Sequence, residues 1–176
     1  MAYITVNTTG TFPALLLTTD IANSNVSATG NGFLGGNILS VSCLQDITVT
    51  NSTGIFSWTD FCSASINKVT TPSDNEISTN IVIDDEKFFG DANATSSTSP
   101  WYGVSGLSQN RVEVAFRVQL NNSANIGANL PGNTFAYWGT GYVSSVAPTV
   151  SPDSPVWVSP LTIAVSGDMG SGPKVV

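Results

Sequence analysis

Val112-Glu-Val-Ala-Phe-Arg-Val-Gln-Leu120 has an apolar residue at every second position. Successive side chains of a β-strand point to opposite faces, so this period of two predicts a strand with one buried face and one polar face. Glu113, Arg117 and Gln119 are expected on the polar face. Helix periodicity is nearly absent from the rest of the chain, whereas short alternating stretches recur, which indicates an all-β fold.

The other alternating stretches are separated by Gly, Asn, Ser and Pro. About eight short strands between such turn residues are typical of an antiparallel β-sandwich or barrel. A length of 176 residues suits one domain, so we predict a single β domain over residues 1–176. The remaining strands are expected near residues 2–6, 38–43, 46–50, 62–69, 77–83, 134–146 and 156–166.

One short helix is predicted at residues 84–90. Asp84 can accept hydrogen bonds from the first turn, and the two acids after it favour the positive end of the helix dipole. Phe88 and Phe89 are expected to pack inward, and Gly90 can adopt the left-handed conformation that ends a helix.

Apart from the short stretch at 2–6, three segments carry no clear strand pattern. Residues 1–37 are predicted to be an extended arm or loop region, and residues 91–108 a long polar connection. Residues 168–176 are predicted to form a mobile tail. The expected fold is therefore an antiparallel β-sandwich or barrel with one short helix and long N-terminal and mid-chain loops.

The last predicted strand changes phase. Val156 and Val158 share one parity, whereas the apolar residues of 161–165 share the other. A one-residue bulge at Ser159-Pro160 would bring both sets to one face, because proline is tolerated where no ladder hydrogen bond is lost. The residues then expected in the core are Leu161, Ile163 and Val165.

The charge content is low. Asp, Glu, Lys and Arg make up 10% of the residues, compared with about 25% in an ordinary domain. A surface of neutral polar groups is easier to desolvate, which favours a protein covered by neighbours, although a secreted Ser/Thr-rich domain has a similar composition. The net charge of −7 leaves too few cations to hold phosphate, so binding to nucleic acid or an anionic membrane is not expected.

The chain starts Met1-Ala-Tyr3 without a basic and apolar leader, and no apolar run approaches the ~18 residues of a membrane helix. We therefore expect a soluble protein made without export. Cys43 and Cys62 lie on the apolar parity of their strands and are interpreted as small buried hydrophobes. A reducing compartment disfavours a disulfide between them, and the sequence leaves that pairing open.

No catalytic, cofactor-binding or metal site is predicted. The chain has no histidine, which removes Ser-His-Asp, Cys-His and histidine-metal sites, and no Gly-rich phosphate loop is present. The acids at 84–86 with Asp91 could bind calcium, but a helix cap explains them better. A glycosidase needs only two acids, and nothing in the sequence pairs two of them across a groove.

The aromatic residues admit two interpretations. They could stack on sugars, as in an exported glycan-binding module, or they could fill the core and the interfaces between subunits, which is the more common use of Trp and Tyr. The residues concerned are Trp58, Trp101, Tyr102, Tyr137, Trp138, Tyr142 and Trp157.

The C-terminal third resembles the closing strand pair of bacteriophage tail tube proteins. The strand Phe135-Ala-Tyr-Trp-Gly-Thr-Gly-Tyr-Val-Ser-Ser-Val146 is followed by a short turn containing Pro and Asp, and then by Val156-Trp-Val158 and Leu161-Thr-Ile-Ala-Val-Ser-Gly167. The strand at 111–120 and the helix at 84–90 precede this pair in the order that the family has. The resemblance covers about the last 100 residues, and residues 1–37 match nothing in it.

This resemblance implies a non-enzymatic virion protein, assembled in the bacterial host, whose copies form hexameric rings that stack into a tube with other tail proteins. DNA would pass through the tube without specific binding, and acidic side chains would line its channel. The segments 91–108 or 7–37 are expected to reach the next ring. A capsid decoration protein or another tail protein is the nearest alternative.

Overall fold

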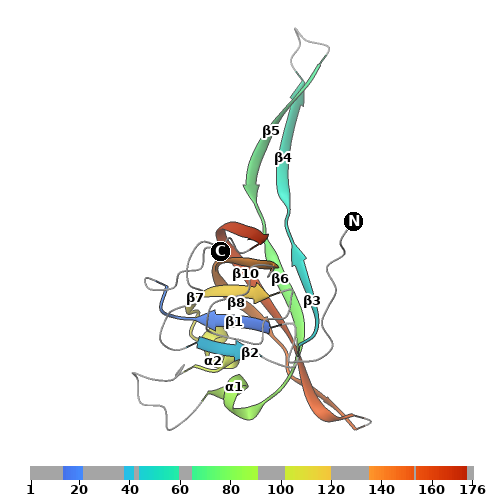
Figure 1. Ribbon diagram of the computed structural model, residues 1–176. Helices are drawn as coiled ribbons and strands as arrows, with labels where there is room; N and C mark the ends of the chain where they lie inside the picture. The colour runs from blue at the N-terminus through green and yellow to red at the C-terminus, as the bar shows by residue number, and fades with distance from the viewer. Residues whose placement is uncertain are drawn as a thin grey trace.

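The computed structural model describes residues 14–21, 38–41, 44–59, 65–90, 102–119, 135–152 and 154–173. The all-β prediction is confirmed: the described strands form one large antiparallel sheet, which curls into a half-barrel, and one two-stranded sheet (Figure 1). The large sheet is therefore closer to the barrel than to the sandwich. The predicted strand at 2–6 lies outside the described residues, and so do Cys43 and Cys62.

Seven strands form the main path of the large sheet, and β9 (Thr149–Ser151) pairs with one of them at the side. Every described pairing is antiparallel. In spatial order the strands are β2 (Ile38–Val41), β1 (Ala14–Thr18), β7 (Glu113–Gln119), β8 (Phe135–Val146), β10 (Ser154–Pro173), β6 (Glu76–Val82) and β3 (Leu44–Thr50).

One face of this sheet carries the hydrophobic core, which two short helices complete. Phe88 of α1 (Asp85–Phe89) and Leu107 of α2 (Val104–Gln109) are buried against it. The helices approach closely at Gly103, where an added Cβ would lie 2.4 Å from the Phe88 carbonyl. Fully buried strand residues of the core include Leu15, Leu17, Ile77, Val114, Phe116, Val118, Leu161 and Ile163.

The structure corrects the predictions for the loosely patterned segments. Residues 14–18, inside the predicted arm at 1–37, form β1, which pairs with β2 and β7 in the interior of the sheet. Its residues Leu15-Leu-Leu17 are buried on both faces of the sheet. Such a strand has no alternation of apolar and polar residues, so the sequence pattern did not predict it. Residues 104–109 form α2, part of which was predicted as loop. Strand β10 continues to Pro173, through most of the predicted tail.

The bulge predicted at Ser159-Pro160 is wrong, because β10 pairs with β6 without interruption there. Ser159 itself occupies the inward position and is fully buried; its hydroxyl accepts a hydrogen bond from the Ala147 N–H at 3.1 Å and donates one to the Pro160 carbonyl at 2.8 Å. A satisfied serine therefore continues the inward set without a change of phase. Leu161 and Ile163 are fully buried as predicted, and Val165 packs against the core.

Arg117 is the other correction in the sheet. It was expected on an exposed polar face, but only 2% of it is exposed. Its neighbours on the same face of β7 and β1, Ala115 and Leu16, are also buried. Desolvation lowers the pKa of the Arg117 guanidinium, and its Nε has no hydrogen-bond partner among the described residues. Both faces of the sheet are thus covered at β7.

The predicted helix is confirmed. Helix α1 begins after Asp84, whose carboxylate accepts the Lys87 N–H at 3.3 Å, and it ends at Gly90, which has a φ of 90°. Phe88 is buried as expected, whereas Phe89 was wrongly predicted to pack inward: 62% of it is exposed. In a helix of five residues, adjacent side chains cannot both face the core.

Candidate assembly surfaces

The face of β3, β6, β10 and β8 opposite the core is polar and open. Directly paired residues of antiparallel strands lie on one face, so the pairings define this polar face as three rows. The first row is Asp46, Asn80 and Pro160, and the second is Thr48, Ser78, Thr162 and Ser145. The third is Thr50, Glu76, Ala164, Tyr142 and Glu113. None of these residues is buried.

The charges of this polar face are all acidic. Asp46, Glu76 and Glu113 belong to its rows, and the other members carry hydroxyl, amide or small apolar side chains. Four of the five basic residues are described, and all lie elsewhere: Lys68 in β5, Lys87 in α1, Arg111 beside α2 and Arg117 in buried surroundings. Within the described part of the chain, this face therefore offers no cation to a phosphate.

Asp46 has a structural role on the polar face. Its carboxylate accepts the Asn80 N–H at 2.8 Å and the Asn80 side-chain amide at 3.0 and 3.1 Å. Its carbonyl accepts a hydrogen bond from the Thr79 hydroxyl. The pairing of β3 with β6 shifts by one residue between Leu44 and Asp46, so Asp46 fastens the strand next to a β-bulge. Glu76 and Glu113 are not bound in this way by any described hydrogen bond.

The polar face is bounded by two stretches of strand edge that have no partner among the described strands. β3 ends the sheet and pairs only with β6 among the described strands. At the other side, β7 pairs with β8 only as far as Tyr142, so residues 143–146 of β8 extend beyond it. Free edges present unpaired N–H and carbonyl groups, which are a template for a strand of another chain.

A two-stranded arm rises from one end of the sheet (Figure 1). It consists of β4 (Thr53–Thr59) and β5 (Ile66–Ser73), which prolong β3 and β6 and form a sheet of their own. Of these two strands, β5 was predicted in part and β4 was missed, because the apolar residues of β4 occur on both parities. These apolar residues are exposed, with 57% of Phe56 and 61% of Ile55 open to solvent.

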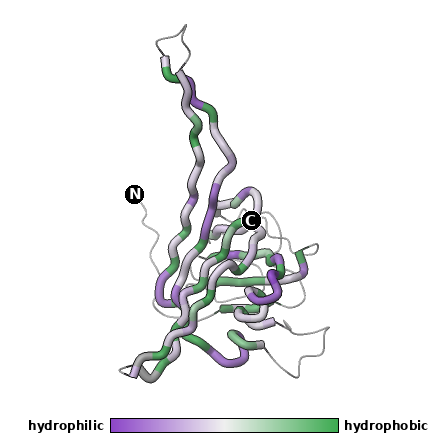
Figure 2. The backbone as a smooth tube through the Cα atoms, turned by 180° about the vertical axis from the view of Figure 1, so that it is seen from behind, coloured by the Kyte–Doolittle hydropathy of each residue, from purple (hydrophilic) through white to green (hydrophobic). Residues whose placement is uncertain are grey.

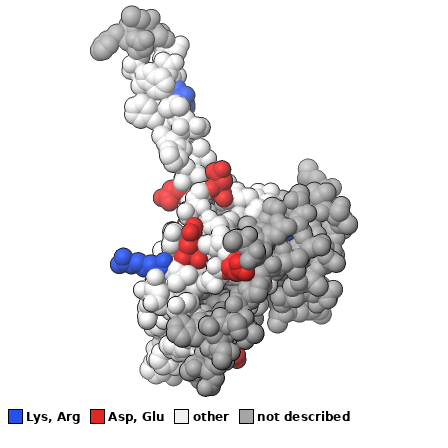
Figure 3. Space-filling model, turned by 90° about the vertical axis from the view of Figure 1, so that its left-hand side faces the viewer, with Lys and Arg blue, Asp and Glu red and all other residues white. Residues whose placement is uncertain are grey.

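The two faces of the arm differ. Phe56 pairs with Val69, and Trp58 pairs with Asn67, which puts an uncharged aromatic face on one side. The Phe56 and Trp58 rings stack with centroids 6.0 Å apart. We call the opposite side the mixed face; its residues are Ile55, Ser57, Thr59, Ile66, Lys68 and Thr70. Lys68 is the one charged residue of β4 and β5 (Figure 3).

Asn75 joins the arm to the body. It is 5% exposed, its side-chain oxygen accepts the Ser52 N–H at 3.2 Å, and its amide donates to the Ser73 hydroxyl at 3.3 Å. Its carbonyl accepts the Val165 N–H of β10 at 3.0 Å. The side chain thus ties together both strands of the arm at the point where the backbone is anchored to the sheet.

Asn75→Ala is expected to lower the free energy of unfolding by about 1–3 kcal/mol, because it removes the two hydrogen bonds that the buried Asn75 side chain makes to the Ser52 N–H and the Ser73 hydroxyl. Ser57→Ala, on the exposed part of the arm, is the control and should change it by less than ~0.5 kcal/mol. Chemical denaturation followed by tryptophan fluorescence measures both. An Asn75→Ala protein as stable as the wild type would show that the junction does not depend on this side chain.

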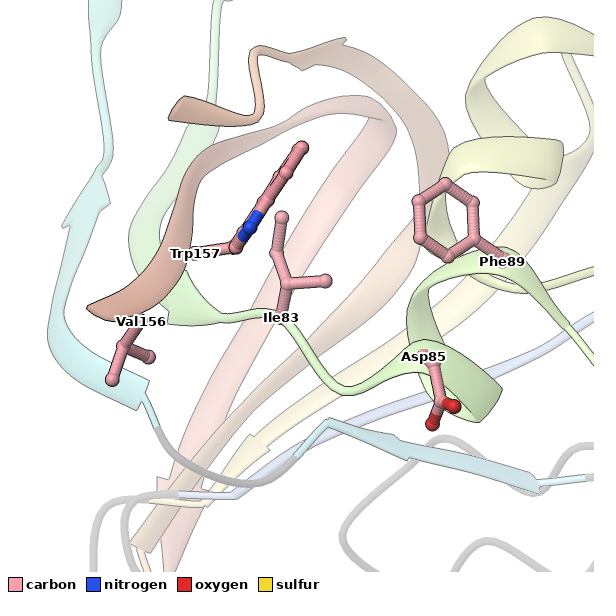
Figure 4. A pocket seen from close by; sticks show the side chains of 5 residues that line it. All are labelled: Ile83, Asp85, Phe89, Val156 and Trp157. Carbon is pink, nitrogen blue, oxygen red and sulfur yellow. The ribbon is translucent and has the colours of Figure 1, made fainter. Parts of the chain in front are cut away.

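An apolar pocket lies between α1 and the first part of β10 (Figure 4). These two elements lie at the end of the body away from the arm (Figure 1). The volume of the pocket is about 370 Å³, and its apolar lining consists of Ile83, Phe89, Val156 and Trp157. Asp85 lies at its rim, with the carboxylate turned away from the space between Phe89 and Trp157 (Figure 4). Trp157 is 49% exposed.

The described residues hold no group of three or more metal-ligating side chains, and no described helix is long and apolar enough to cross a membrane. The acids at 84–86 serve the helix: Asp84 caps it, and Asp85 accepts the Glu86 N–H at 2.8 Å. The described candidate aromatics lie on different parts of the molecule, with Trp138 in β8 and Tyr142 on the polar face. Trp58 lies on the arm, Trp157 in the pocket, and Tyr102 and Tyr137 pack against the core, while Trp101 is outside the described residues.

Comparisons with known proteins give a likeness of fold. No protein-family model matches the chain, and no curated protein sequence matches it. A solved structure, the tail of an empty gene transfer agent particle refined with helical and C6 symmetry, is similar with a TM-score of 0.53 at 13% identity. The alignment covers 90% of this chain and 95% of that one. A chain from the virion of a native gene transfer agent particle aligns with a TM-score of 0.48 at 12% identity, over the same shares of the two chains.

Proposed function

We propose that this chain is a non-enzymatic structural protein of the tail of a phage-like particle, and that its copies form stacked rings around a channel for DNA. The observation that carries the proposal is the polar face: a broad, open strand surface rich in hydroxyl groups, with acids and without Lys or Arg among the described residues. Such a surface repels phosphate and has no groups that would hold DNA in place.

Ring formation is supported by the free edges at both sides of this face. In the proposed ring, the outer edge of β3 in one copy lies beside residues 143–146 of β8 in the next copy. Six copies with four strands each would give a barrel of about 24 strands, and barrels of ~16–18 strands already leave an aqueous channel. The fold likeness to a tail refined with C6 symmetry is consistent with six copies.

Stacking of the rings is supported by the arm. An isolated two-stranded hairpin is marginally stable in water, and exposed apolar patches of this kind mark association surfaces. The arm leaves the body at one end of the molecule, so it can reach a copy beyond its own ring (Figure 2).

The test is electron microscopy of the purified protein over a range of concentrations. We expect annular particles with six subunits and, at high concentration, tubes with an open centre. A protein that stays monomeric at every concentration, or that forms trimers without a channel, would overturn the proposal.

A further inference from the structure

Two apolar surfaces lie at opposite ends of the molecule. The arm projects from one end, while α1 and the first part of β10, which form the pocket, lie at the other (Figures 1 and 2). A chain with complementary surfaces at its two ends can join head to tail with a second copy, and that kind of contact continues from copy to copy.

The mixed face of the arm fits the pocket chemically. Ile66 is 64% exposed and lies two residues before Lys68 in β5, so both side chains belong to the same face of the arm. The pocket offers an apolar lining of Ile83, Phe89, Val156 and Trp157 with a carboxylate, Asp85, at its rim. An aliphatic side chain and a cation two residues away would therefore meet an apolar cavity and an anion.

The charges favour this face of the arm over the aromatic face. Asp85 is the one charged residue among those that line the pocket, so the charge at its rim is negative. Lys68 is the only cation on β4 and β5, and the strand register puts it on the mixed face. The aromatic face carries no charge to match the rim.

We infer that the arm of one copy docks in the pocket of a second copy, with Ile66 in the cavity lined by Phe89 and Trp157 and Lys68 paired with Asp85. The inference deepens the proposed function, because it names the surfaces that join one ring to the next. Each contact is small and weak by itself, and repetition around a ring makes the stack stable.

Two substitutions test the docking from its two sides. Ile66→Asp removes the apolar side chain that enters the cavity, and Trp157→Asp puts a charge in the lining of the cavity. Both residues are exposed, so thermal melting should show each protein folded like the wild type. Each variant alone is expected to stop at the ring, or to form tubes at least tenfold shorter than wild-type tubes at equal concentration. Tubes of wild-type length from either variant would overturn the docking.

Mixing the two variants identifies the partner as a second copy. Rings of Ile66→Asp keep an intact pocket and rings of Trp157→Asp keep an intact arm, so a mixture can form one junction and no second one. Analytical ultracentrifugation should show a species of twice the mass of either variant alone, without longer tubes. A mixture in which both variants keep their separate masses contradicts the inference.

Charge exchange tests the pairing of Lys68 with Asp85. Lys68→Glu alone and Asp85→Lys alone should each shorten the tubes, by about fivefold or more because reversal replaces attraction with repulsion at every junction. The double variant Lys68→Glu/Asp85→Lys should recover at least half of the wild-type length. A double variant as defective as the worse single variant would contradict the pairing.

These results separate the inference from the proposed function. Full-length tubes from both apolar variants would overturn the docking and leave the tube protein proposal standing. Pair formation in the mixture, together with a wild-type protein that stacks without closing rings, would overturn the ring and support the docking.

Discussion

Replacing Glu76 and Glu113 with lysine is expected to leave assembly intact and to make the assembled protein hold DNA. The two residues lie in one row of the polar face, on β6 and β7, and neither side chain makes a described hydrogen bond. Each reversal changes the charge by +2, so a ring would gain many cations facing its channel. Cations on phosphates dominate the affinity for DNA, and their effect is screened by salt.

Co-sedimentation of labelled duplex DNA with assembled protein measures this effect. Wild-type tubes should retain no DNA at 50 or 200 mM salt. Tubes of the double variant should retain it at ~50 mM and release it by ~200 mM, because 6–10 phosphate contacts lose about 10³–10⁵ in affinity over that interval. Particles carrying the variant should deliver DNA at least tenfold less efficiently.

Asp74→Lys/Asp168→Lys is the matched control, since it changes the charge equally at two exposed residues outside the rows of the polar face. Equal retention of DNA by the control would mean that net charge, and not the polar face, governs the effect. Variant tubes that retain no DNA at 50 mM salt would show that Glu76 and Glu113 do not face the channel.

Removing the aromatic face of the arm is expected to raise the concentration needed for assembly by at least about 100-fold. Phe56, Trp58 and Val69 are each about half exposed in the single chain, so much of their apolar area is free to be buried by neighbours. Burial of a large apolar side chain contributes ~1.5–3 kcal/mol. Three such side chains together exceed about 2.7 kcal/mol. A loss of about 2.7 kcal/mol from the free energy of assembly already raises the required concentration 100-fold.

The triple variant Phe56→Ser/Trp58→Ser/Val69→Thr tests this expectation, with light scattering against protein concentration as the measurement. Its free energy of unfolding should stay close to that of the wild type, since the residues do not belong to the core. Val150→Ser, at an equally exposed apolar residue of β9, is the control and should assemble normally. A triple variant that assembles at the wild-type concentration would contradict a role for the arm.

The sequence predicted the strands whose apolar residues alternate with polar ones. β6, β7, β8 and β10 were each located by this alternation, and α1 was located by its cap and its glycine. β1 was missed because Leu15-Leu-Leu17 is buried on both sides. β4 was missed because its apolar residues lie on both sides of the strand, so neither parity is consistently apolar.

The candidate surfaces could be predicted only in part. Low charge and net acidity indicated a surface that avoids phosphate, but the membership of the polar face depends on which strands pair, and no local pattern contains that information. Arg117 shows the limit. Its parity placed it with the polar residues of β7. The sheet is covered on both faces at β7, whereas β8, β10, β6 and β3 each have one open face.

A helical reconstruction of tubes formed by the purified protein, at a resolution that traces the strands, tests the central claim most directly. The account predicts that β3, β6, β10 and β8 of every copy surround the channel, with Thr48, Glu76 and Thr162 facing the bore. A tube in which this face points outward, or in which Lys or Arg side chains line the bore, would contradict it.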